Sequence, residues 1–292
     1  MPALRRALLF RIGALGDVLL TRRLTYSLFL AGLRSTLFAP ARHASVLLAD
    51  PWIEGLVDAE HPDSAPAFAG HWPRSDGGFE VAAVISGSVD LVRAAQSAAT
   101  SVIQIPPGPW SDDVPIGQQW SNAMSAVFPP FAGSLPLLPT ESQQALVRGA
   151  TLIHPGSGSA NKNWPVQRFV ELNRSLKNQG HRMVWVRGPA EADFPTELSG
   201  VEVLNRPSLR ALGATLAQSR LFIGNDSGVS HLAAAVGAPT VVIYGPTSDL
   251  VWRPDGPRLE TIRSASGALD AVKVEAVLAA IQELTRLRSS RE

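Results

Sequence analysis

Short, nearly continuous apolar runs alternate along the chain with longer segments in which apolar residues recur at helical spacing. The first run covers residues 7–12, and a glycine-containing turn at 13–17 and a helical pattern extending to about residue 33 follow it. Strands of this kind are typical of parallel sheets, which helices cover on both faces. Residues 59–78, rich in Pro, Gly, Asp and His, are expected to form a long surface loop. In this half of the chain the pattern also predicts strands near 36–39, 81–85 and 101–105 and helices near 41–49, 88–98 and 116–127.

The pattern lapses between Pro129 and Gln144, a segment that contains four prolines and has no helical period. Such a composition is typical of a domain linker. The alternation then restarts and predicts strands at 150–154, 182–187, 220–224 and 239–244, helices at 165–179, 208–218 and 228–236, and a last helix over 269–287. We therefore expect an α/β protein with two doubly wound domains, residues 1–138 and 139–292, facing each other across a cleft. The last helix could pack back toward the first domain.

Composition excludes several classes of protein. The 292 residues contain no Cys, which rules out disulfides, thiol catalysis and zinc sites built on cysteine. A net charge of +1 argues against a general nucleic-acid-binding protein, which usually carries a large basic surplus. The apolar runs are short and interrupted by Arg, Gly or Pro, so no transmembrane helix is expected.

Basic residues gather near the amino end, where residues 1–49 hold seven Arg and one acid, Asp17. This bias indicates either an anionic partner, such as the lipid phosphates of a membrane surface, or an ordinary solvated face. The opening Arg pair and apolar run are similar to a secretory signal, but Arg11 interrupts the run and no small-residue cleavage site follows. We therefore expect a cytoplasmic protein, with peripheral contact with the inner membrane as an option.

The first candidate site is the turn Gly13-Ala-Leu-Gly16-Asp17 after the first strand. Doubly wound folds bind ligands at such turns. The spacing differs from the dinucleotide fingerprint Gly-x-Gly-x-x-Gly, and no acid closes the second strand, so NAD binding is disfavoured. At the start of a helix, Asp17 is either an N-cap or a general base that takes a proton from an acceptor hydroxyl.

The second candidate site is a small-residue loop, 154–165, between a strand and the helix that Pro165 opens. Its backbone N–H groups and the hydroxyls of Ser157 and Ser159 suit phosphate oxygens. Lys162 is one of only three lysines in the chain. Its ammonium could neutralise a diphosphate leaving group, although an exposed lysine in an ordinary loop is the alternative.

The third and most specific site is residues 224–239, where a strand delivers Asp226 and where Ser227 and Gly228 open a helix. The N–H groups at such a helix start can hold phosphate, and His231 lies one turn further on. A buried structural histidine is the usual alternative for His231. Two turns add support: Glu191 could bind a ribose or sugar hydroxyl, and the turn 244–247 follows another strand.

Together these segments resemble glycosyltransferase family 9, the ADP-heptose:lipopolysaccharide heptosyltransferases. The matching stretches, in the same order over nearly the whole chain, are residues 11–21, 155–169, 224–237 and 245–247. The resemblance implies the GT-B fold, which has two facing Rossmann-like domains, the first holding the acceptor and the second the sugar nucleotide. It also implies an inverting reaction that needs no metal ion and no cofactor, with an ADP-sugar as the donor substrate.

The resemblance assigns roles to individual residues. It places Asp17 on the general base, Lys162 on the phosphate-contacting lysine and Asp226 on a contact to the transferred sugar. The other residues expected on the donor side are Ser157, Ser159, Glu191, Ser227, Gly228 and His231. On the acceptor side we expect a loop that includes Gly13, Gly16, Arg22 and Arg23. The family often has Thr-x-Pro after the first motif, whereas Thr21 is followed here by two arginines, which leaves the acceptor less defined than the donor.

The resulting expectation is a transferase that moves a heptose from ADP-heptose to a lipopolysaccharide core acceptor, either Kdo or heptose. The partners would be a nucleotide sugar and a lipopolysaccharide-type acceptor, with no nucleic acid. Alternatives are a GT-B enzyme with another donor or acceptor, a sugar-nucleotide epimerase, or a non-catalytic homologue that binds the sugar nucleotide. The six His are scattered without metal-ligand spacing, so metal chemistry is poorly supported.

Overall fold

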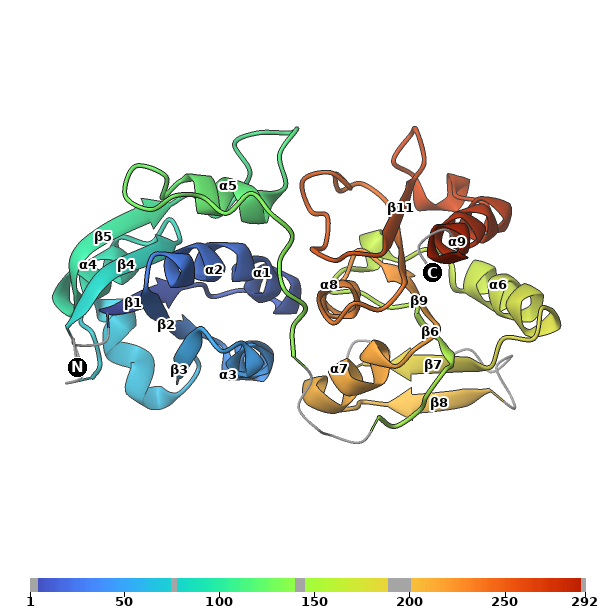
Figure 1. Ribbon diagram of the computed structural model, residues 1–292, viewed down its shortest axis with the longest axis horizontal. Coiled ribbons are helices and arrows are strands. Elements are labelled where there is room, and N and C mark those ends of the chain that lie inside the picture. The colour runs from blue at the N-terminus through green and yellow to red at the C-terminus, as the bar shows by residue number, and fades with distance from the viewer. Residues whose placement is uncertain (1–4, 75–77, 140–144, 189–200, 290–292) are drawn as a thin grey trace. The chain divides into compact units, whose positions relative to one another are not determined.

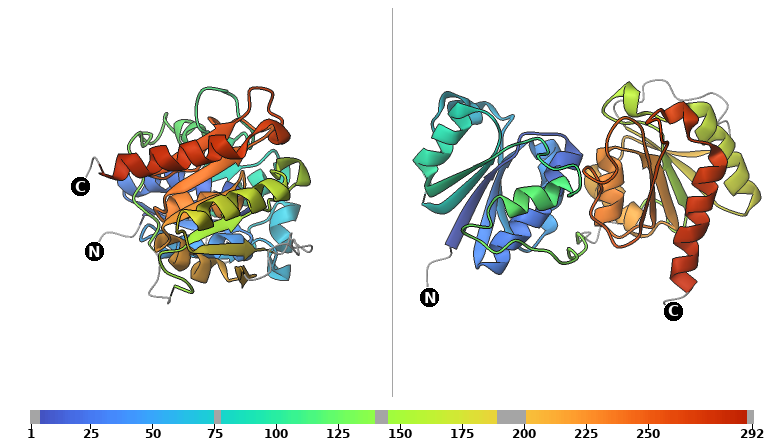
Figure 2. Two further views of the ribbon diagram at one scale, coloured as in Figure 1. Left: turned by 90° about the vertical axis from the view of Figure 1, so that its right-hand side faces the viewer. Right: turned by 90° about the horizontal axis from the view of Figure 1, so that it is seen from above.

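A computed structural model describes residues 5–74, 78–139, 145–188 and 201–289. The chain divides into two compact units, Met1–Pro136 and Leu137–Glu292, called here the N-terminal and C-terminal units. Each unit is built on one parallel sheet (Figure 1). Helices lie on both faces of each sheet, as the nearly continuous apolar strands predict (Figure 2).

The sheet of the N-terminal unit has the strand order β3-β2-β1-β4-β5. Its strands are β1 Arg5–Phe10, β2 Leu33–Ala39, β3 Ile53–Asp58, β4 Phe79–Ile85 and β5 Ala99–Ile105. Its α-helices are α1 Leu15–Leu20, α2 Arg22–Leu30, α3 Ala41–Ala44, α4 Val89–Ala98 and α5 Ile116–Asn122. The order is that of a Rossmann sheet, in which the direction of winding reverses beside the first strand.

The C-terminal unit repeats this plan with the order β11-β10-β9-β6-β7-β8. Its strands are β6 Thr151–His154, β7 Met183–Arg187, β8 Glu202–Asn205, β9 Leu221–Asn225, β10 Thr240–Tyr244 and β11 Leu259–Arg263. Its α-helices are α6 Val166–Asn178, α7 Leu209–Ala217, α8 Gly228–Ala235 and α9 Val274–Ser289. Here the winding reverses between β6 and β9, so the loops after these two strands lie at the expected ligand position.

Several local predictions were wrong, and three of them change the fold. The first helix does not run unbroken to residue 33: it stops at Leu20, α2 follows, and Gly32, with φ +85°, lets the chain turn into β2. Residues 59–78 are more than a loop, since Pro62–Ala69 form a 3-10 helix and Trp72 packs against Phe10 of β1. The last helix begins at Val274 instead of 269, after a separate 3-10 turn.

Helix α9 packs on α6 and on the β10–β11 side of the sheet of its own unit. Buried tryptophans define this core: Trp164 donates its indole N–H to the carbonyl of Val272 at 2.9 Å, and Trp185 donates to Asn173 Oδ1 at 3.0 Å. These bonds satisfy the polar edges of the two indoles, so that the rings can be wholly buried. None of the helices in the described residues is long and apolar enough to cross a membrane.

The proline-rich segment predicted as a linker is anchored where the structure describes it. Phe131 donates its backbone N–H to Ser27 Oγ at 2.9 Å and packs edge-on against Tyr26. Leu138, already in the C-terminal unit, donates its N–H to the carbonyl of Ala235 at 2.8 Å and is buried. The division between the units, after Pro136, falls within this segment.

Arg22 is part of the core of the N-terminal unit. Its guanidinium binds both carboxylate oxygens of Asp50, at 2.8 and 2.9 Å, and donates to the carbonyl of Pro136 at 2.9 Å. The Arg22 side chain is 2% exposed and that of Asp50 is wholly buried. Burial raises the pKa of Asp50, and the bonds from Arg22 oppose that rise. Arg22 and Arg23 therefore lie on helix α2, not in the predicted acceptor-side loop. The Arg22 guanidinium is buried in an ion pair within the core.

Replacing Arg22 with Met should destabilise the protein by about 3–5 kcal/mol, because it leaves the Asp50 carboxylate buried without its cation. Denaturant unfolding measures this change. Arg93→Met is the matched control, since among the described residues Arg93 has only an exposed 3.5 Å pair with Asp90, the loss of which should cost less than about 1 kcal/mol. Equal effects from the two variants would contradict the structural role of Arg22.

Candidate functional site

Asp17 lies at the carboxyl edge of the N-terminal sheet, in the third position of α1. Its Oδ2 accepts the backbone N–H of Ala14 at 3.0 Å, and its Oδ1 accepts a hydrogen bond from Arg11 Nη2 at 2.7 Å. Ala14, not Asp17, is the N-cap, so the N-cap interpretation of Asp17 was wrong. The carboxylate instead accepts the backbone N–H of the N-cap residue, three positions earlier, and offsets the positive end of the helix. About a quarter of the side chain is exposed (26%), which leaves it accessible to a ligand.

Gly13 makes room for this carboxylate. A Cβ at Gly13 would lie 2.8 Å from both Cβ and Oδ2 of Asp17, closer than such atoms can approach. The ring Nδ1 of His43 lies 2.9 Å from the carbonyl of Gly13 and fixes the turn from the side. Gly16 is the second residue of α1 and so lies in the helix itself, not in a loop.

Arg23 anchors the chain that follows α5. It donates to Gln118 Oε1 at 3.0 Å and to the carbonyls of Gly133 at 3.1 Å and Phe131 at 3.4 Å. Through these bonds the Arg23 side chain fastens α2 to the segment before the unit boundary.

At the carboxyl edge of the C-terminal sheet, Asp226 gathers two other residues. Its Oδ2 accepts hydrogen bonds from Lys162 Nζ and from Thr247 Oγ1, both at 2.7 Å. The carboxylate is nearly buried at 7% exposure, whereas the Lys162 side chain is 33% exposed. The sequence predicts Lys162 and Asp226 as separate contacts, and the structure joins them. Thr247 was noted only within a turn; its place just after β10, beside β9, is the signal that links it to Asp226.

Asn225 belongs to the candidate site, although the sequence assigned it no role. It is wholly buried, donates through Nδ2 to the carbonyl of Pro155 at 2.6 Å and accepts the N–H of Trp164 at 3.0 Å. One side chain at the end of β9 therefore holds both ends of the loop that carries Lys162. An amide at a strand end, flanked by a predicted binding acid, was the only sequence signal.

The two serines of that loop bond to each other. Ser157 Oγ donates to the carbonyl of Ser159 at 2.7 Å and accepts the N–H of Ser159 at 3.2 Å. The single hydroxyl hydrogen of Ser157 is thus used within the loop, so in this structure Ser157 shapes the loop instead of offering a hydrogen bond to a phosphate.

The start of α8 has the predicted form. Ser227 is the N-cap, its Oγ accepting the N–H of Ser230 at 3.4 Å, and the helix begins at Gly228. His231 lies in the first turns of α8 and is buried. Ser230 Oγ donates to the carbonyl of Asn225 at 2.5 Å, which ties the helix start to the end of β9. Glu191, the predicted ribose contact, lies outside the described residues.

Tyr244 adds no charge to this edge. Burial, with Asp226 nearby, holds the pKa of the Tyr244 phenol well above its ordinary value, and its hydroxyl donates to the carbonyl of Trp252 at 2.9 Å. In the described part of the chain, no three His, Asp or Glu side chains are grouped as metal ligands would be. The predicted independence from metal stays a prediction.

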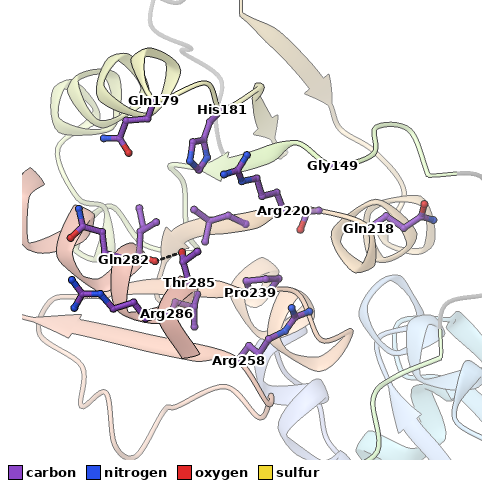
Figure 3. A pocket seen from close by; sticks show the side chains of 14 residues that line it. Gly149, Gln179, His181, Gln218, Arg220, Pro239, Arg258, Gln282, Thr285 and Arg286 are labelled. Atoms are coloured by element: carbon purple, nitrogen blue, oxygen red, sulfur yellow. Dashed lines mark hydrogen bonds between the residues drawn. The ribbon is translucent and has the colours of Figure 1, made fainter. Parts of the chain in front are cut away.

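A cavity of about 890 Å³ lies at the opposite edge of the C-terminal sheet, where the strands begin (Figure 3). Its lining includes Gln179 and Gln218, the C-cap residues directly after helices α6 and α7, together with the basic Arg220 and Arg258. Cations at helix carboxyl ends offset the helix dipoles, which explains the basic lining. Burial and the neighbouring Arg220 lower the pKa of His181 on the same wall. None of the predicted site residues lines this cavity.

The family of this protein follows from its similarity to known proteins. The family model described as glycosyltransferase family 9 (heptosyltransferase) matches residues 120–281, more than half of the chain. This chain belongs to glycosyltransferase family 9. The resemblance drawn from the three sequence motifs is confirmed.

Individual relatives agree with this assignment. The lipopolysaccharide heptosyltransferase 3 of Escherichia coli is 30% identical over 112 residues, covering 35% of this chain and 33% of that protein. The chain thus matches about a third of the length of this curated relative. A glycosyltransferase of family 9 from Veillonella parvula superposes with a TM-score of 0.80 at 16% identity, covering 96% of this chain and 97% of that one.

The E. coli heptosyltransferase WaaC with ADP superposes with a TM-score of 0.73 at 18% identity, covering 96% and 99% of the two chains. At these identities the structural likeness shows the fold alone. The predicted GT-B class, with two Rossmann-like α/β domains, is confirmed, while the cleft between them stays a prediction.

Substituting Gly13 with Ala should destabilise the N-terminal unit by about 1–3 kcal/mol, because the new methyl group displaces Asp17. Denaturant unfolding measures the loss. Gly87→Ala is the matched control, since a Cβ there meets nothing within 4 Å, and its effect should stay below about 1 kcal/mol. If the two substitutions have the same effect on stability, the space at Gly13 is not required by Asp17.

Proposed function

We propose that this protein is an inverting glycosyltransferase that moves a heptose from ADP-heptose to the Kdo or heptose of a lipopolysaccharide core, without a metal ion. Family membership supports the reaction class. The observation that carries the proposal is the placement of the chemistry: each Rossmann sheet has a carboxylate with a cationic partner at the point where its winding reverses. Those pairs are Asp17 with Arg11 and Asp226 with Lys162.

The C-terminal unit would bind the donor. Lys162 is exposed enough to reach a ligand, yet its bond to Asp226 restrains it at the strand edge. In the complex, its ammonium would contact the diphosphate and Asp226 would contact a hydroxyl of the sugar. The N–H groups of Gly228 and Val229, the first two of α8, have no acceptor within the helix and would bind phosphate oxygens.

The N-terminal unit would supply the base. Asp17 would take the proton of an acceptor hydroxyl as that oxygen attacks the anomeric carbon from the face opposite the nucleotide. The bond from the anomeric carbon to the phosphate oxygen breaks, and its electron pair leaves on ADP. Lys162 and the start of α8 would stabilise the charge that develops on the diphosphate. A single displacement of this kind inverts the anomeric configuration.

The partners that follow are an ADP-sugar and a lipopolysaccharide acceptor. Because that acceptor is anchored in a lipid layer, we propose that the protein works at the cytoplasmic face of the inner membrane. The arginine-rich residues 1–49, through the side chains that remain exposed, would face the anionic surface.

Replacing Asp17 with Asn should lower kcat about 10²–10⁴-fold, because the amide cannot accept the acceptor proton. The assay is ADP release from ADP-heptose in the presence of lipid A bearing Kdo. Asp63→Asn, which removes an exposed acid of the same unit, should retain normal turnover. Wild-type kcat in the Asp17 variant would refute its role as the base, and calorimetric ADP binding by that variant shows that it remains folded.

Replacing Lys162 with Ala should weaken ADP binding about 10- to 100-fold, since a hydrogen bond to a charged group contributes about 1.5–3 kcal/mol. Isothermal calorimetry measures Kd for ADP, with UDP and GDP as competing candidates for the donor nucleotide. Lys177→Ala removes an exposed lysine near the end of α6 and should leave Kd unchanged. An unchanged Kd in the Lys162 variant would remove this lysine from the donor site, and a preference for UDP or GDP would rule out ADP-heptose.

A further inference from the structure

Arg11 lies between Asp17 and a buried tryptophan. It is the first residue after β1 and is 9% exposed. Its Nη2 donates to Asp17 Oδ1 at 2.7 Å, and its guanidinium carbon lies 4.7 Å from the centre of the Trp120 ring. Trp120 belongs to α5 and is wholly buried. A guanidinium over an indole face is attracted by the ring electrons, and more strongly where water is excluded.

This arrangement immobilises the cation as well as the carboxylate. Asp17 is held on one oxygen by Arg11 and on the other by the N–H of Ala14. Arg11 in turn is restrained, because its guanidinium lies over the Trp120 ring and is nearly buried. The side-chain entropy of the pair is therefore lost when the protein folds and not when a substrate binds, which is the condition for a preorganised site.

Two arginine–aspartate pairs of the same unit differ in an informative way. Arg22 binds Asp50 side-on, with Nε and Nη2 each donating to one carboxylate oxygen. Arg11 uses only Nη2, and its Nε is buried with no hydrogen-bond partner in the described structure. A side-on pair would turn both oxygens of Asp17 toward Arg11. In the observed pair, Asp17 Oδ2 stays bonded to the N–H of Ala14 and Arg11 Nε has no acceptor among the described residues. An unsatisfied buried donor of this kind costs about 1–3 kcal/mol of stability.

We infer that Arg11 is a positioning residue for Asp17: clamped on Trp120, it fixes the rotamer of the carboxylate and supplies its counter-charge without enclosing it. This inference rests on the proposed function, because it assigns Arg11 a role only through the base. It also explains the unsatisfied Nε, since a pair that served stability alone would adopt the side-on geometry of Arg22 and Asp50.

The test compares Arg11→Met with Arg6→Met. Arg6, near the other end of β1, is a close match, since it pairs with Glu54 at 2.6 Å and its guanidinium carbon lies 4.4 Å from the centre of the Phe79 ring. Arg11→Met should lower kcat about 10- to 100-fold, as expected for a displaced reacting group, with KM for ADP-heptose unchanged. Arg6→Met should retain wild-type kcat and KM. Arg11→Lys, which keeps the charge, should recover part of the lost turnover.

A double variant separates positioning from a merely structural effect. If Arg11 acts through Asp17, adding Arg11→Met to Asp17→Asn causes no further loss of kcat, because the group it positions is already gone. Additive losses would overturn the inference, as would wild-type turnover in Arg11→Met beside an inactive Asp17→Asn. Wild-type turnover in Asp17→Asn itself would instead refute the proposed base. Should Arg11→Met fail to fold, Arg11→Lys alone and combined with Asp17→Asn provides the same comparison.

Discussion

The strands described in each sheet all run in the same direction, and the placement of every candidate site residue depends on that constraint. A parallel sheet sends the carboxyl end of every strand to one edge. The winding reverses beside β1 and beside β6, and in doubly wound folds the loops after such strands are where ligands bind. Asp17, Lys162 and Asp226 come from three separate stretches of sequence, yet each follows a strand that borders such a point.

The side chains that shape the loops at this edge are as important for the geometry of the candidate sites as those expected to bind substrate. Asn225 uses its amide at both ends of the Lys162 loop, and His43 holds the turn at Gly13. These contacts do no chemistry of their own. They fix the loop backbones, and a fixed backbone is what lets an aspartate or lysine keep one orientation at the edge of a sheet.

The central strands and most of the helices could be predicted from the sequence because they are apolar on both faces or regularly amphipathic. Strands β3, β8 and β11 could not be predicted in this way, because each is an edge strand of its sheet. In each of them a glutamate interrupts the apolar run: Glu54, Glu202 and Glu260. The three motifs supplied the candidate site residues, but which of those side chains bond to one another could not be read from the sequence. Nothing in the spacing shows that Lys162 and Thr247 meet at Asp226, or that Arg22 pairs with Asp50 inside the core.

Each unit also places a tryptophan beside its candidate site: the ring of Trp120 carries Arg11, and the backbone of Trp164 binds Asn225. Indole emission responds to nearby charge, so light is a direct means of following the two sites. A ligand that moves Arg11 changes the field over Trp120, and one that shifts the Lys162 loop moves Trp164. Two of the seven tryptophans are thus built-in optical reporters, one for each unit, and replacing either with Phe identifies its share of the emission change.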